Sequence, residues 1–363
     1  MNARGNFHRL CRFEKGARPP RWETLGFWDE TVRRWRREGL PEDKTPEEYF
    51  EMDRRDFLPM NSGFTRPPFL PPFEKETIKE DERTVVYRDE FGVIRRERKD
   101  DPQLSMPQWL EFPVKDRKDW EEIKSRLDPD SPGRYPDWEK LRQSFDNRNF
   151  PLCLTICGAY GTPRNLFGEE RLAYMYYDDP DLITDIQNHW LWFYKRLCDH
   201  VLPNIELDYV LIWEDMAFKT APLISPDLFK RFMLPYYEEL IDHIKGYGVK
   251  WIMVDSDGDN RVLLPLFIQA GVNVFMPFEI AANMDPVSIR KEYGRNLVIF
   301  GGIDKRALSR GRAAIEEEVT SRVPYLLVTG GYIPGIDHST PPDVSFDNYR
   351  YFVELVRDLV EKI

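Results

Sequence analysis

Short apolar runs, each ending in a polar or glycine-rich turn, alternate with amphipathic stretches in the second half of the chain. The runs are rich in β-branched and aromatic residues, as buried parallel strands are, and cover residues 150–156, 209–213, 251–254, 272–276, 297–300 and 331–333. Helical patterns separate them at residues 181–201, 226–247, 261–271, 286–293 and 312–328. This alternation indicates βα units and a parallel sheet.

The first half of the chain contains weaker signals. Six βα units run from residue 150 onward, and residues 18–24 and 56–60 are candidates for the two further strands that an eight-stranded barrel needs. Residues 84–95 resemble a hairpin that turns at 89–92. We therefore predict an α/β fold: a single (β/α)8 barrel over 1–363, elaborated in 1–149 by a β-hairpin insertion and regular in 150–363. A doubly wound sheet is the competing architecture.

Composition excludes several classes of protein. The 52 Lys and Arg against 63 Asp and Glu give a net charge of −11, which argues against a nucleic-acid or anionic-membrane binder. The sequence has neither an apolar window long enough to span a bilayer nor a signal-peptide pattern, so we expect a cytoplasmic location. Cys153 and Cys157 lie on one predicted strand, roughly 13 Å apart at about 3.3 Å per residue, so we expect buried, reduced thiols rather than a metal pair.

Acidic residues follow the predicted strands, where the active sites of parallel barrels form. Converging carboxylates repel one another, so such a pocket needs a metal, a cationic ligand or shared protons. His338 joins this group from a loop rich in Pro, Asp and Ser. The acids at these strand ends are Glu214, Asp215, Asp255, Asp257, Glu279 and Asp304.

Each acidic motif also has a simpler interpretation. An EF-hand loop beginning at Asp255 is excluded, because its sixth and twelfth positions are Asn260 and Leu266. The strand-end Asp-x-Asp-Gly also resembles aspartyl-phosphate-forming phosphatases, and helix capping is a further alternative. Glu214 and Asp215 could cap a helix or pair with a base such as Lys219.

Three C-terminal segments resemble the uroporphyrinogen decarboxylase superfamily, which also contains cobalamin-dependent methyltransferases. The resemblance implies a (β/α)8 barrel. The segments are Gly301-Gly-Ile-Asp-Lys-Arg-Ala-Leu308, Gly331-Tyr-Ile-Pro-Gly-Ile-Asp-His338 and Pro342-Asp-Val-Ser-Phe-Asp-Asn-Tyr349.

Resemblance to the decarboxylase branch of this superfamily would imply a cofactor-free enzyme. Such an enzyme binds a polycarboxylate tetrapyrrole through an Arg-Gln-x-Gly-Arg segment. His338 matches the C-terminal histidine of the family, but the matching segment here is Glu23-Thr-Leu-Gly-Phe27, without arginines. Guanidinium groups are the usual partners of carboxylates. The resemblance therefore favours the other branch.

Resemblance to the methyltransferase branch would imply a zinc enzyme. Its ligands are a His-x-Cys pair after the fifth strand and a third ligand, a cysteine, in the last loop. Asp255, Asp257 and His338 stand at the matching positions. Two carboxylates and an imidazole form a harder site than thiolates, suited to zinc, iron, manganese or magnesium. The alternative is that no metal binds and the acids act as acid–base groups.

We therefore expect methyl transfer between a corrinoid or methylated small molecule and an acceptor, with a corrinoid protein as a further partner and neither nucleic acid nor membrane involved. The alternatives are cofactor-free tetrapyrrole decarboxylation and non-catalytic corrinoid or tetrapyrrole binding. The sequence does not indicate the oligomeric state. The expected roles are catalysis for Glu214, Asp215 and His338, a divalent metal for Asp255, Asp257 and His338, and substrate binding for Tyr160, Gly301, Gly302 and Asp304.

Overall fold

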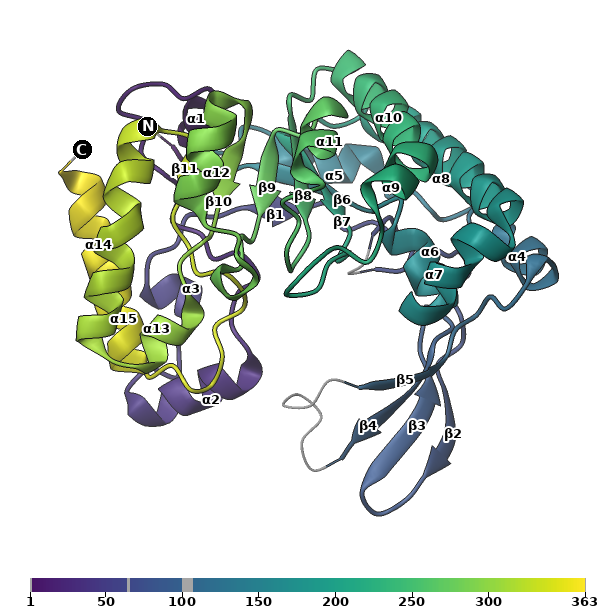
Figure 1. Ribbon diagram of the computed structural model, residues 1–363, viewed down its shortest axis with the longest axis horizontal. Helices are drawn as coiled ribbons and strands as arrows, with labels where there is room; N and C mark the ends of the chain where they lie inside the picture. The colour runs from purple at the N-terminus through teal and green to yellow at the C-terminus, as the bar shows by residue number, and fades with distance from the viewer. Residues whose placement is uncertain (1, 64–65, 100–106, 363) are drawn as a thin grey trace.

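The computed structural model describes residues 2–63, 66–99 and 107–362 (Figure 1). Within these ranges, seven parallel strands form a sheet in the order β1-β6-β7-β8-β9-β10-β11. Since neighbouring strands run in the same direction, their C-terminal ends lie along one edge. The strands are β1 (Asp56–Phe57), β6 (Leu152–Cys157), β7 (Tyr209–Trp213), β8 (Trp251–Asp255), β9 (Val274–Met276), β10 (Val298–Phe300) and β11 (Tyr332–Ile333).

Strands β6 to β11 are buried on both faces of this sheet, which is why they appear as apolar runs in the sequence, whereas Phe57 in the edge strand β1 is exposed. Side chains alternate between the faces along each strand. Tyr209 and Met253 belong to a cluster on the inner face, which α1 (Ala3–Cys11) joins through Phe7. Val210 and Ile252 belong to the larger cluster beneath the outer helices.

The predicted helical patterns of the second half are confirmed. The single pattern predicted at 226–247 is divided at Met233 into α9 and α10. The division falls just before Pro235, because proline has no N–H to donate within a continuous helix. Two short 3-10 turns, η1 (Ile280–Ala282) and η2 (Gly294–Asn296), interrupt the connections. The helices are α6 (Gly161–Phe167), α7 (Glu169–Asp178), α8 (Pro180–Val201), α9 (Pro226–Phe232), α10 (Leu234–Gly246), α11 (Leu264–Gln269), α12 (Pro286–Tyr293), α13 (Lys305–Ser309), α14 (Arg312–Thr329) and α15 (Phe346–Glu361).

The segment 18–24 is not a strand, so that prediction was wrong. Pro19 and Pro20 lack the N–H donors that a strand ladder requires. The N–H of Arg21 donates instead to the side chain of Asp53, at 2.8 Å. In the described ranges the edge strands β1 and β11 do not pair with each other, so the parallel sheet is a curled half-barrel. Its closure into an eight-stranded barrel stays a prediction.

A separate antiparallel sheet projects from the body of the protein below α7 (Figure 1). Four strands form it in the described residues: β2 (Glu76–Glu80), β3 (Thr84–Arg88), β4 (Ile94–Arg98) and β5 (Gln108–Glu111). The predicted hairpin is confirmed, because β3 pairs with β4 and Asp89 accepts the N–H groups of Phe91 and Val93 in the turn. The sequence analysis missed β2 and β5, which are exposed throughout.

The remaining helices belong to the N-terminal part of the chain. They are α2 (Asp29–Glu38), α3 (Pro46–Tyr49), α4 (Arg117–Lys124) and α5 (Trp138–Phe145). As predicted, Cys153 and Cys157 are buried free thiols, and Cys11 and Cys198 are buried and free as well. Over the part of the chain that the structure describes, every helix is too short or too polar to cross a membrane.

Candidate functional site

Acidic side chains gather at the C-terminal edge of the parallel sheet because its central strands end in register. Trp213, the last residue of β7, pairs with Asp255, the last residue of β8, and Asp255 pairs in turn with Met276 at the end of β9. The chain then passes into loops that carry the polar groups. These groups are Asp215 after β7, Asp257 after β8, Glu279 after β9 and His338 after β11.

Three of these side chains form a compact group of potential ligands. Asp257, Glu279 and His338 each bring one donor atom to within 4.8 Å of the other two. The His338 Nε2 atom lies 3.3 Å from Oδ2 of Asp257. The second oxygen of Asp257, Oδ1, is buried and accepts no hydrogen bond from any described residue. Burying an acceptor without a donor costs free energy, so this oxygen favours a bound cation.

A backbone N–H and a lysine side chain from two other segments hold the Glu279 carboxylate in place. Gly258 N–H donates to Oε2 at 3.0 Å, and Lys305 Nζ donates to Oε1 at 3.2 Å. Gly258 has a φ of +79°, and a Cβ atom there would lie 2.4 Å from the carbonyl oxygen of Ala217. The turn after Asp257 therefore requires glycine.

Asp337 connects the loop of His338 to the loop of Glu279. Its carboxylate accepts the N–H of Ile280 at 3.0 Å and the N–H of Lys305 at 2.9 Å. Burial raises the pKa of Asp337 to about 6, against the opposing effect of these two donors. Two loops that are distant in sequence are thus joined beside the ligand group.

The sequence prediction placed a metal on Asp255, Asp257 and His338. The structure brings Asp257 and His338 together, but Glu279 rather than Asp255 completes the three-donor group. Asp255 is buried at the end of β8, where burial, helped by the charges of Asp257 and Asp215, raises its pKa well above the ordinary value. The role of Asp255 as a ligand stays a prediction. The sequence did contain a signal for Glu279, because this residue also follows a strand.

Asp215 lies beside this group in an ion pair. Its Oδ2 is 2.8 Å from Nη1 of Arg164 in α6, so the pairing base is Arg164 rather than Lys219. Arg164 also contacts Glu169 at 2.6 Å. Burial raises the pKa of Asp215, and Arg164 opposes that rise. A catalytic role for Asp215 stays a prediction.

Glu214 occupies a buried position at the N-terminus of α6. Its Oε2 accepts the N–H groups of Tyr160 at 3.0 Å and Gly161 at 2.7 Å. A Cβ atom on Gly158 would lie 2.1 Å from Cδ of Glu214, so the carboxyl group lies directly on that glycine. Burial raises the pKa of Glu214 to about 8. The geometry is that of helix capping, the simpler interpretation of the sequence, and the predicted roles of Glu214 in catalysis and Tyr160 in substrate binding stay untested.

Three further residues predicted to bind substrate lie after β10. Gly301 and Gly302 have φ values of +97° and +81°, and a Cβ on Gly301 would lie 2.4 Å from the carbonyl oxygen of Pro277. Asp304 accepts the N–H of Arg306 at 2.9 Å and forms an ion pair with its guanidinium at 2.8 Å. The Asp304 carboxylate is therefore engaged at the start of α13. Substrate contacts by these three residues stay a prediction.

A cavity of about 480 Å³ lies between the antiparallel sheet and the end of β7. Arg95 and Trp109 line it from the antiparallel sheet, and Arg164, Trp213 and Asp215 line it from the parallel sheet and α6. The charge of Asp257 is close enough to contribute to the raised pKa of Asp215. The cavity thus leads from the antiparallel sheet toward the acidic edge.

Two carboxylates and one imidazole are a ligand set for a divalent cation of hard or borderline character. Zinc accepts His nitrogen and carboxylate oxygen, and manganese and iron accept the same donors. The unpartnered Oδ1 of Asp257 fits such an ion. Such a ligand set can support Lewis-acid chemistry at this edge of the sheet.

Comparisons with known proteins place this geometry in context. Residues 113–359 match the family model described as uroporphyrinogen decarboxylase (URO-D). No curated protein sequence matches the chain. A solved methyltransferase from Methanosarcina mazei aligns over 99% of this chain and 99% of its own, with a TM-score of 0.58 and 10% identity, which shows a similar fold. A B12-independent methionine synthase from Shewanella sp. W3-18-1, in complex with selenomethionine, aligns over 80% of this chain and 76% of its own, with a TM-score of 0.37 and 10% identity.

Proposed function

The chain belongs to the uroporphyrinogen decarboxylase family, and from this premise we propose that it is a methyltransferase whose divalent cation is held by Asp257, Glu279 and His338. The observation that carries the proposal is the compact three-donor group, in which Oδ1 of Asp257 is buried without a hydrogen-bond partner among the described residues. A cation at this point would compensate the buried negative charge.

The charges around the group favour this reaction over decarboxylation of a polycarboxylate. Such a substrate needs several free cationic side chains to hold its carboxylates. Two cations that contact this edge are already paired, Arg164 with Asp215 and Glu169, and Lys305 with Glu279. Arg55, whose charge acts on Asp255, donates to the backbone carbonyls of Glu23 and Thr24. The acidic edge therefore suits a cation better than a polyanion.

A bound cation would act as a Lewis acid that lowers the pKa of a thiol or hydroxyl acceptor. The protein's own residues perform the other tasks. Lys305 balances the charge of Glu279 and fixes its orientation, and Asp337 fixes the loop before His338. The cavity lined by Asp215 is the side from which we propose that the methyl donor approaches this edge. We propose a corrinoid, free or carried by a partner protein, as the donor.

The test is methyl transfer from methylcobalamin to 2-mercaptoethanol with added Zn²⁺ or Mn²⁺. The methyl group leaves cobalt without the bonding electron pair and forms a carbon–sulfur bond with the thiolate, so cob(I)alamin appears in the absorbance spectrum under anaerobic conditions. We expect turnover by the wild type, a loss of at least about tenfold in Glu279→Gln, and no change in Glu317→Gln, which is exposed on α14. Metal-independent release of CO2 from uroporphyrinogen, without methyl transfer, would contradict the proposal.

A further inference from the structure

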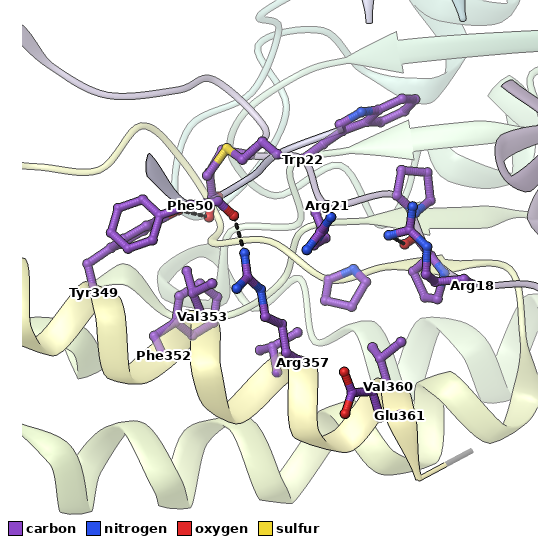
Figure 2. A pocket seen from close by; sticks show the side chains of 16 residues that line it. Arg18, Arg21, Trp22, Phe50, Tyr349, Phe352, Val353, Arg357, Val360 and Glu361 are labelled. Atoms are coloured by element: carbon purple, nitrogen blue, oxygen red, sulfur yellow. Dashed lines mark hydrogen bonds between the residues drawn. The ribbon is translucent and has the colours of Figure 1, made fainter. Parts of the chain in front are cut away.

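A second cavity, of about 190 Å³, lies against α15, and none of Asp257, Glu279 and His338 lines it. Its walls are the segment 18–23, Phe50 and Met52 after α3, and one face of α15. Figure 2 shows Arg357 rising from α15 to a hydrogen bond with the carbonyl oxygen of Phe50, with Arg21 and then Arg18 farther along the cavity. The proposed methyl transfer does not use this cavity.

Three guanidinium groups line this cavity, and their partners leave donors unused. Arg18 pairs with Asp53 at 2.7 Å, and Arg357 donates a hydrogen bond to the carbonyl oxygen of Phe50. Carboxylates are farther from the other two guanidinium groups: Arg21 and Arg357 each lie 3.6 Å from the exposed Glu51, and Arg21 lies 4.0 Å from Asp53. The Nε atoms of Arg21 and Arg357 are buried and have no hydrogen-bond partner in the part of the chain that the structure describes. Buried donors of this kind call for an acceptor from outside the protein.

The three cations also repel one another. Burial lowers the pKa of Arg21, and the charges of Arg357 and Arg18 lower it further, against the attraction of Asp53 and Glu51. An anion between Arg21 and Arg357 would relieve this repulsion and accept hydrogen bonds from the two guanidinium groups. Guanidinium groups bind carboxylates with paired, charge-assisted hydrogen bonds.

Most of the remaining lining is apolar, so the bound anion should carry an apolar group. Phe352, Val353 and Val356 of α15 face Phe50 and Met52 across the cavity. Glu361 also lines the cavity, and the exposed Glu51 contacts Arg21, so a doubly charged group would meet carboxylates as well as arginines. We propose that this cavity binds a small organic monocarboxylate, with its head between Arg21 and Arg357 and its apolar body against α15.

The test is isothermal titration calorimetry of the full chain with octanoate as the probe and octan-1-ol as its uncharged counterpart. We expect saturable binding of octanoate at one site and binding of octan-1-ol that is at least about tenfold weaker, since the alcohol cannot pair with the guanidinium groups. This test needs only the wild-type protein. Equal binding of the two probes, or no saturable binding of octanoate, overturns the proposal.

Variants then locate the site. The double variant Arg21→Met with Arg357→Met should bind octanoate at least about tenfold more weakly. Arg350→Met should bind as the wild type does, because Arg350 lies on α15 outside the cavity lining. Circular dichroism confirms that each variant is folded. Wild-type affinity in a folded double variant would place the probe elsewhere and overturn the assignment.

Discussion

The Nε2 atom of His338 lies 3.3 Å from Oδ2 of Asp257, although β9 and β10 stand between the strands that precede these two residues. Neighbouring strands are about 4.8 Å apart, so in a flat sheet β8 and β11 would be roughly 14 Å apart. The curl of the sheet therefore creates the ligand group. Asp257 and Glu279 follow the neighbouring strands β8 and β9, and the curl of the sheet brings His338 to them across the concave side.

Gly158→Ala should lower stability, because the new Cβ would lie 2.1 Å from Cδ of the buried Glu214. Overpacking of this kind costs roughly 1–3 kcal/mol of unfolding free energy, which urea denaturation would measure. Gly246→Ala is the matched control, since a Cβ there meets no atom within 4 Å. Equal stability of Gly158→Ala and the wild type would show that Glu214 is not held against this glycine.

Asp208→Asn should destabilise the protein at about pH 7 and less so in acid. Asp208 accepts the N–H of Leu152 at 2.8 Å and lies 2.7 Å from Arg4, 2.9 Å from Arg148 and 2.6 Å from His8. These partners outweigh burial and hold the pKa of Asp208 well below its usual range. The stabilisation is therefore complete above the pKa of the unfolded chain and is lost as the pH falls toward the lower, folded pKa.

We expect Asp208→Asn to lose about 3 kcal/mol at neutral pH, because Arg148 is left buried and incompletely paired. Urea denaturation of wild type and variant at about pH 7 and about pH 3 measures the difference. A difference that stays constant between these two conditions would contradict the ionic origin of the stabilisation.

Glu23→Gln should change how stability depends on pH. Burial raises the pKa of Glu23 from 4.5 to about 7, although Tyr349 and the N–H of Ile336 donate hydrogen bonds to the carboxyl group. Between these two pKa values the unfolded chain has lost the proton that the folded chain keeps, so the unfolding free energy falls as the pH rises. The total decrease from this group is about 3 kcal/mol.

Thermal denaturation from about pH 4 to about pH 8 checks the Glu23 prediction. The wild-type stability, taken relative to Glu23→Gln, should fall through this range and level off above about pH 7. The exposed Glu317→Gln should follow the wild type throughout. A wild-type curve parallel to that of Glu23→Gln would show that this carboxyl group does not titrate near neutrality.

The strands that could be predicted from the sequence are those whose side chains are buried. Strands β6 to β11 are buried on both faces, and their apolar composition identifies them without knowledge of their partners. Strand β2 was missed because every residue in it is exposed, so no apolar face marks it. The strand predicted at 18–24 failed because side chains such as that of Asp53, rather than a strand ladder, bond that segment.

The candidate site could be predicted only in part. Strand ends indicate which acids share one edge, and Asp257 and His338 do meet there. The choice between Asp255 and Glu279 as their partner depends on the curl of the sheet and on the bonds from Gly258 and Lys305, which no local pattern encodes.

The most direct test of the metal-centre hypothesis is the Zn²⁺ content of the purified protein after reconstitution and dialysis. The comparison is between the wild type, Glu279→Gln and Asp255→Asn, the last chosen because burial already favours the neutral form of Asp255. The account predicts that the wild type and Asp255→Asn retain the ion and that Glu279→Gln binds it at least about tenfold more weakly. Retention by Glu279→Gln, with loss in Asp255→Asn, would contradict the ligand group of Asp257, Glu279 and His338.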